Sequence, residues 1–230
     1  MCGGEKVMKN GGRCKIKIGA GAFFMAVAML LSERADVFLL YGAVAVLHEL
    51  GHLAAARLRG IAVREIRLDV SGARICAEEG ELSYADELIL CLSGPLVNMI
   101  IVVWGVFAAA ARGISAEELT LSAQSYIFGG EPSAMGACTF FVMCAAIQGF
   151  VNLLPIRTLD GGRVLYCLCA MVFSQRAADR VLSVSGAMCA FVLWTVALFL
   201  MIKWGLGLGI YVFCACLFFG TLRDRELVGE

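Results

Sequence analysis

The apolar residues of this chain are gathered in long runs that are separated by short polar segments. In the run 37–56, for example, the strongly polar groups are His48, Glu49 and His52 alone. A helix needs about 20 mostly apolar residues to cross the hydrocarbon core of a bilayer. The pattern therefore predicts an all-α polytopic membrane protein with about six transmembrane helices, at 18–32, 36–58, 86–111, 134–156, 181–202 and 205–222.

Three of the connections have patterns of their own. Residues 61–75 alternate polar with β-branched or aliphatic positions around Ser71-Gly72, which predicts a small membrane-associated β-hairpin. Residues 163–180 begin apolar and end charged, so we expect an interfacial helix there. Pro155 and the pair Gly161-Gly162 predict an interrupted helix and a tight turn at membrane depth.

Composition agrees with a membrane protein. Hydrophobic residues make up 60% of the 230 positions and charged residues 17%, whereas soluble domains carry about 25% charged residues. The net charge of zero gives no electrostatic preference for nucleic acid. Most of the 11 cysteines lie inside apolar segments, where they behave as small hydrophobic residues rather than as a disulfide framework.

The placement of charge predicts the topology. Basic residues dominate segment 1–17 and alternate connections, whereas acidic residues such as Glu117 and Glu118 dominate the others. By the positive-inside rule, both termini face the cytoplasm. Segment 1–17 with the apolar stretch after it also fits a secretory signal peptide, but 32–36 lacks a small-x-small cleavage site, which favours an uncleaved first helix.

The candidate chemistry lies in His48-Glu49-Leu50-Gly51-His52, which contains both histidines of the chain. On a helix, positions i and i+4 share a face, so two imidazoles can bind one Zn²⁺ while the carboxylate of Glu49 lies beside the open position of the metal. In that place Glu49 can take a proton from water. A chance occurrence is disfavoured because ionisable groups inside a membrane segment cost several kcal/mol.

A catalytic zinc site needs a third protein ligand, which here cannot be histidine. A thiolate has no local signature, and Asp36 lies too far from His48 along one helix. Asp160 follows the fourth apolar run on the same predicted side as the end of the helix that carries His52. Asp160 also fits the N-cap of the helix predicted at 163–180, but we prefer coordination of the metal.

Three segments together resemble the site-2 protease family of intramembrane zinc metalloproteases. The short architecture is most similar to the branch of stage IV sporulation protein FB, which cleaves a membrane-associated pro-sigma factor. The resemblance covers about residues 18–222 and rests on HELGH at 48–52, SGPLVN at 93–98 and N-x-x-P-x-x-x-x-D-G-G at 152–162.

The resemblance implies roles for five residues. His48, His52 and Asp160 would be zinc ligands, Glu49 the catalytic acid and base, and Asn152 a polar group near the scissile carbonyl. It also implies that Gly94-Pro95 and Asn98 pack against the core helices. The implied activity is regulated intramembrane proteolysis of a membrane-associated protein, with membrane-protein inhibitors or regulators as further partners, in the bacterial cytoplasmic or forespore membrane.

We expect a single membrane domain over 1–230, with a basic N-terminus at 1–17 and a membrane core at 18–222. Neither an inserted PDZ domain nor a CBS pair is expected, which leaves nucleotide regulation in doubt. Two other functions stay open: a membrane metal transporter or sensor, which leaves Glu49 unexplained, and a catalytically inactive membrane scaffold. A serine intramembrane protease is excluded because both histidines belong to HELGH.

Overall fold

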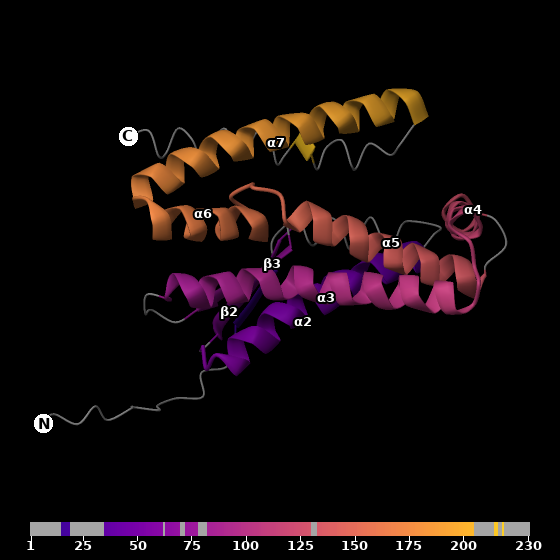
Figure 1. Cartoon of the computed structure of the whole chain (residues 1–230), viewed down its shortest axis with the longest axis horizontal. Helices are drawn as coiled ribbons and strands as arrows, with labels where there is room; N and C mark the ends of the chain where they lie inside the picture. The colour runs from indigo at the N-terminus through magenta and orange to yellow at the C-terminus, as the bar shows by residue number, and fades with distance from the viewer. Residues whose placement is uncertain are drawn as a thin grey trace, which may run out of the picture.

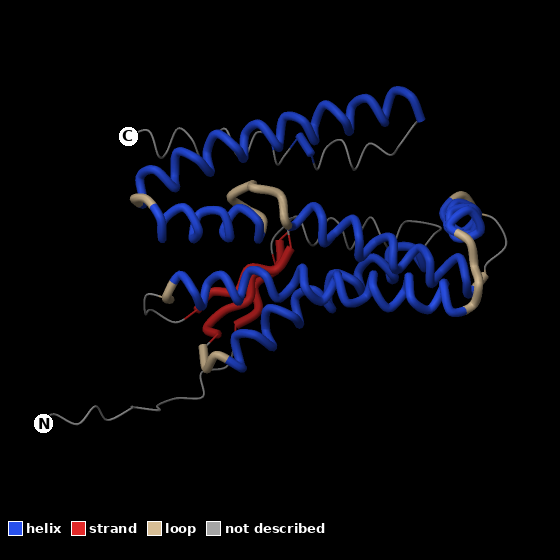
Figure 2. Tube along the Cα trace, in the orientation of Figure 1, coloured by secondary structure: helices blue, strands red, loops and turns tan. Residues whose placement is uncertain are grey.

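A computed structural model describes residues 15–18, 35–61, 63–69, 72–77, 82–129, 133–204, 214–215 and 218 of the chain. This part is mostly helical, with a small sheet beside one end of the bundle (Figures 1 and 2). The helices are α2 (Ala35–Leu58), α3 (Tyr84–Ala111), α4 (Ala116–Ile127), α5 (Ala134–Asn152), α6 (Asp160–Val172) and α7 (Gln175–Trp204).

Local sequence explains several helix ends. Ser83, Ser115 and Ser133 each accept a hydrogen bond from a backbone N–H of the first turn, as N-cap residues do. At α4, Glu118 completes a capping box with Ser115, and these hydrogen bonds lower the pKa of the Glu118 carboxyl. Helix α2 ends before Gly60, whose φ of 67° is readily adopted only by glycine.

Four helices in the described part are long and apolar enough to cross a membrane: α2, α3, α5 and α7. Large apolar side chains such as Leu39, Trp104, Phe107 and Phe199 are exposed on their outer faces. Exposed apolar surface on several long helices is expected where lipid replaces water as the solvent. The chain is therefore an integral membrane protein.

The predicted count of six spans is not supported by the structure. The predictions at 36–58, 86–111, 134–156 and 181–202 correspond to α2, α3, α5 and α7, although α5 ends at Asn152 and α7 begins at Gln175. The other two, 18–32 and 205–222, lie almost wholly outside the described residues.

Two elements differ from the sequence prediction. The interfacial helix expected at 163–180 is divided between α6 and α7, because the chain turns at Phe173 and Ser174. Helix α4 lies in a connection for which no helix was predicted, and it packs on α5 through its buried residues Ala123 and Tyr126. With 12 residues, α4 is too short to cross a membrane, so the apolar runs of the sequence do not predict it.

The strands are β1 (Lys15–Ile18), β2 (Val63–Asp69) and β3 (Gly72–Ala77) in the order β1-β2-β3. β1 pairs parallel with β2, and β2 pairs antiparallel with β3. The segment predicted as a hairpin thus contains two paired strands, while residues 70 and 71 between them lie outside the described residues. β3 contacts α2, the helix that carries both histidines.

Helix α3 is the central packing element, since it contacts α2, α5 and α6 (Figure 1). Small residues let these helices approach closely. A Cβ on Gly51 of α2 would lie 2.7 Å from the carbonyl oxygen of Ser93, and a Cβ on Gly105 would overlap Val142 of α5. In the absence of a hydrophobic driving force between helices in lipid, such close backbone packing holds helices together.

Candidate metal centre

Helix α2 supplies the two histidines. His48 and His52 lie on its buried face together with Val44, Gly51 and Ala55, as the spacing of a helix requires. Both residues are almost inaccessible, at 1% exposure for His48 and 8% for His52. The rings pack edge to face with centroids 4.8 Å apart, so both Nε2 atoms point to one place.

Asp160 reaches the same place from the other half of the chain. Helix α5 ends at Asn152, Pro155 lies in the turn that follows, and α6 begins at Asp160. The glycines after Asp160 are not in a tight turn, as the sequence predicted, but in the first turn of α6. There a Cβ on Gly161 would overlap the backbone of Leu153, so only glycine lets α6 start this close to the end of α5.

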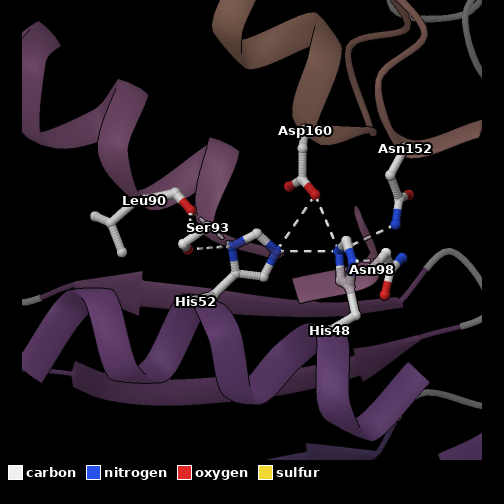
Figure 3. Close-up of polar contacts among 7 residues, drawn as sticks. All are labelled: His48, His52, Leu90, Ser93, Asn98, Asn152 and Asp160. Atoms are coloured by element: carbon white, nitrogen blue, oxygen red, sulfur yellow. Dashed lines mark hydrogen bonds and ion pairs between the residues drawn. The ribbon is translucent and has the colours of Figure 1, made fainter. Parts of the chain in front are cut away.

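The alternative role of Asp160 as an N-cap is wrong. The N-cap of α6 is Leu159, which makes no capping hydrogen bond through its side chain. The Asp160 carboxylate instead faces the histidines (Figure 3). Burial raises the pKa of this carboxyl, but its contacts with His48 and His52 lower it more, and the net pKa lies below the ordinary value. The group is therefore an anionic oxygen donor.

Three potential ligand atoms form a nearly equilateral triangle. Nε2 of His48 lies 3.2 Å from Nε2 of His52, and Oδ2 of Asp160 lies 3.1 Å from the first and 3.3 Å from the second. Ligand atoms about 2.0–2.2 Å from a tetrahedral Zn²⁺ lie about 3.3 Å from one another. The donor types and their mutual distances thus fit a zinc site with one open position.

The other nitrogen of His52 is held by α3. Nδ1 of His52 donates to the carbonyl oxygen of Leu90 at 2.7 Å, and the hydroxyl of Ser93 lies 3.3 Å from the same nitrogen. A carbonyl oxygen can only accept, so the proton of a neutral His52 is on Nδ1 and the lone pair of Nε2 is available to a metal. Such a contact orients a ligating histidine.

Gly94 forms the wall of the site on the side of α3. A Cβ at this position would lie 2.7 Å from Nε2 of His48 and would overlap the ring of His52. Any larger residue would therefore occupy the space that the ligand atoms face. The segment 93–98 does more than pack against core helices, because Gly94 and Asn98 both contact the histidines.

The two predicted catalytic residues lie at the edge of the triangle. A carboxylate oxygen of Glu49 and ligand atoms of His48 and His52 all lie within 4.8 Å of one another. The amide nitrogen of Asn152, the last residue of α5, lies 3.0 Å from Nε2 of His48. The structure therefore brings together all five residues that the sequence singled out.

Ion pairs fasten the ends of the site helices near this centre. Arg163 of α6 donates to Glu87 of α3 at 2.8 Å, and Arg59 after α2 pairs with Asp86 of α3. Two neighbouring acidic residues of α3 thus hold the helices that carry the candidate ligands. These side chains are partly exposed, so water and salt screen both pairs and they orient the helices more than they stabilise the fold.

Sequence reasoning missed the contributions of Leu90, Ser93, Gly94 and Asn98 to the site. The signal that could have found Asn98 is its buried polar side chain in the middle of a membrane-length apolar helix, where such residues are costly and need a partner. Leu90 has no signal, because it acts through its backbone oxygen.

The arrangement of the helices also occurs in a solved structure. The structure is similar to that of the site-2 protease from Methanocaldococcus jannaschii, with a TM-score of 0.62 and 21% sequence identity over 94% of this chain and 93% of that one. At this identity the likeness shows the fold alone. No curated protein matches the chain.

The sequence gives the more specific assignment. Residues 37–196 match the model of peptidase family M50, and the chain belongs to that family. Members of family M50 are zinc-dependent membrane metalloproteases. The matched segment contains every candidate ligand and both candidate catalytic residues.

Proposed function

We propose that this protein is a zinc-dependent intramembrane endopeptidase that cleaves a membrane-associated protein substrate. The observation that carries the proposal is the triangle of His48, His52 and Asp160 with Glu49 beside it, on helices of membrane length. Membership of family M50 supports it independently.

The zinc ion would be held by His48, His52 and Asp160, and when bound it supplies Lewis acidity at the fourth position. Glu49 then acts as the acid and base: its carboxylate accepts a proton from the attacking water and later donates a proton to the leaving amine. Asn152 offers an amide N–H donor at the edge of the site, where it stabilises negative charge that develops on the scissile carbonyl oxygen.

A helical substrate must unwind before its backbone reaches these groups, because its peptide groups are paired within the helix. Among the strands that the structure describes, β3 lies at an edge of the sheet, and it contacts α2. We infer that an unwound substrate segment adds to this edge through main-chain hydrogen bonds, which would place it beside the helix of the two histidines.

The substrate we propose is a membrane-tethered transcription regulator, such as the pro-sigma factor cleaved by the sporulation branch that this sequence resembles. The protein then acts in regulated intramembrane proteolysis in a bacterial cytoplasmic or forespore membrane, under the control of membrane-protein regulators. Both termini and the C-terminal end of α2 lie on the cytoplasmic side in this proposal, as the distribution of Lys and Arg supports.

Co-expression tests the proposal. The full chain is expressed with epitope-tagged, membrane-tethered regulators, and each is followed for a shortened, released product. We expect cleavage of at least one substrate by the wild type and none by a Glu49→Gln variant. A protein that moves zinc across vesicle membranes and cleaves no substrate would instead support the metal transporter.

A further inference from the structure

His48 has a second ring nitrogen whose partner determines whether the first can bind a metal. Its Nε2 atom points at the triangle with His52 and Asp160. To bind a metal, that nitrogen must present its lone pair, and a neutral imidazole then carries its proton on Nδ1. The group that faces Nδ1 must therefore be an acceptor.

The group that faces Nδ1 is the side-chain amide of Asn98. Its Nδ2 atom lies 3.2 Å from Nδ1 of His48, and both residues are 1% exposed. Within the part of the chain that the structure describes, the buried Oδ1 atom of Asn98 has no hydrogen-bond partner. If His48 binds a metal in this orientation, its Nδ1–H faces the amide N–H₂ of Asn98, so two donors face each other. The Oδ1 atom of Asn98 then accepts no hydrogen bond.

One rotation removes the conflict between the two donors. Turning the amide by 180° about its Cβ–Cγ bond exchanges the positions of oxygen and nitrogen and moves no other atom of the residue. The oxygen then faces Nδ1 of His48. Helix α5 approaches this side chain closely and limits its movement away from the ring, since a Cβ added to Gly149 would lie 3.1 Å from Cβ of Asn98.

The partner of His52 shows the same logic. There Nδ1 donates to the Leu90 carbonyl oxygen, an obligatory acceptor, at 2.7 Å. Leu90 and Asn98 lie about two turns apart on α3, and His48 and His52 lie about one turn apart on α2. Helix α3 therefore places a polar group against the Nδ1 atom of each histidine, and with the Asn98 amide rotated both groups are oxygens.

We propose that Asn98 is a positioning residue of the metal centre: its amide oxygen accepts the Nδ1–H of His48 and thereby holds the lone pair of Nε2 toward the metal. This inference rests on the proposed zinc site. Outer partners of ligating histidines contribute about 10–100-fold to metal affinity. In this role Asn98 acts through His48 rather than on the substrate.

Two variants of nearly equal shape test the proposal in the full-length protein. Asn98→Asp keeps an acceptor and removes the donor, whereas Asn98→Leu removes both. Zinc affinity is measured by competition with a chelator in detergent micelles. We expect Asn98→Leu to bind zinc about 10–100-fold more weakly, and Asn98→Asp to bind it within about threefold of the wild type or more tightly. A residue needed only for packing would tolerate Asn98→Leu, because leucine has nearly the same shape as asparagine.

A loss of zinc affinity in Asn98→Asp as large as in Asn98→Leu would overturn the proposal, since the amide N–H₂ would then be the essential group. Unchanged affinity in Asn98→Leu would overturn it equally. If Asn98→Leu does not fold, the proposal is tested on the wild type by the protonation of its histidine nitrogens. With only two histidines in the chain, the ¹⁵N spectrum of histidine-labelled, zinc-loaded protein should show Nδ1 protonated and Nε2 metal-bound in both, whereas zinc on Nδ1 of His48 excludes the proposed contact.

These measurements separate the inference from the proposed function. If zinc binds as expected and Asn98→Asp rescues it, but no substrate is cleaved, the protease proposal fails and the role of Asn98 stands. If the wild type cleaves a substrate but the two Asn98 variants bind zinc equally well, the role of Asn98 fails and the protease proposal stands.

Discussion

Oδ2 of Asp160 lies 3.1 Å from Nε2 of His48, although 112 positions separate the two residues in the chain. The contact joins the first turn of α6 to the middle of α2, and α3 packs against both helices. The candidate metal centre therefore requires the packing of three helices and cannot form from the histidine pair alone.

From this relationship we expect the loss of Asp160 to abolish stoichiometric zinc. Asp160→Ala leaves two nitrogen ligands, and its zinc affinity should fall by more than the ~10–100-fold that loss of an outer partner costs. Elemental analysis of purified protein measures it. Asp179→Ala is a matched control, since Asp179 pairs with Arg157 rather than with the histidines. Undiminished zinc in Asp160→Ala would show that the third ligand is another residue.

Glu49→Gln should separate binding from catalysis. The amide keeps the shape of the side chain but cannot accept a proton, so cleavage should fall by about 10²–10⁴-fold while one zinc per chain remains. His48→Ala is the contrasting variant and should lose both zinc and activity. Cleavage near the wild-type rate in Glu49→Gln would mean that another group is the base.

Gly94→Ala should disable the site without unfolding the protein. The added methyl group would enter the space beside Nε2 of His48 and overlap His52, so we expect loss of zinc and a fall in cleavage of about 10²-fold or more. The control is Gly42→Ala on α2, where a Cβ meets nothing within 4 Å. That change should keep activity and add about 0.5–1 kcal/mol to stability, measured by thermal unfolding.

Reporter fusions should place the two ends of the bundle on opposite sides of the membrane. A fusion near Glu118 in α4 should report the outer side, because that connection is acidic. Fusions at Ser174, between α6 and α7, and at position 230 should report the cytoplasm. If Glu118 and Ser174 report the same side, α5 does not span the membrane as a single crossing.

Features that depend only on residues near one another in the chain could be predicted from the sequence. The apolar runs that are long enough to cross a bilayer form α2, α3, α5 and α7. A helix pairs all the backbone N–H and C=O groups of its segment, which lipid cannot do. His48 and His52 share a face because the helix repeats every 3.6 residues. The same repeat places Glu49 beside the pair of histidines. These relations hold within one helix and need no partner.

Tertiary packing decided the rest. Whether Asp160 caps a helix or faces a metal depends on how closely α6 approaches α5, which the backbone contact at Gly161 allows. Leu90 and Asn98 become partners of the histidines only because α3 lies against α2. The turn at Phe173 and the helix α4 also escaped prediction, since short amphipathic segments are stabilised mainly by the surfaces they cover. Such contacts join residues far apart in the chain, and no periodicity in the sequence records them.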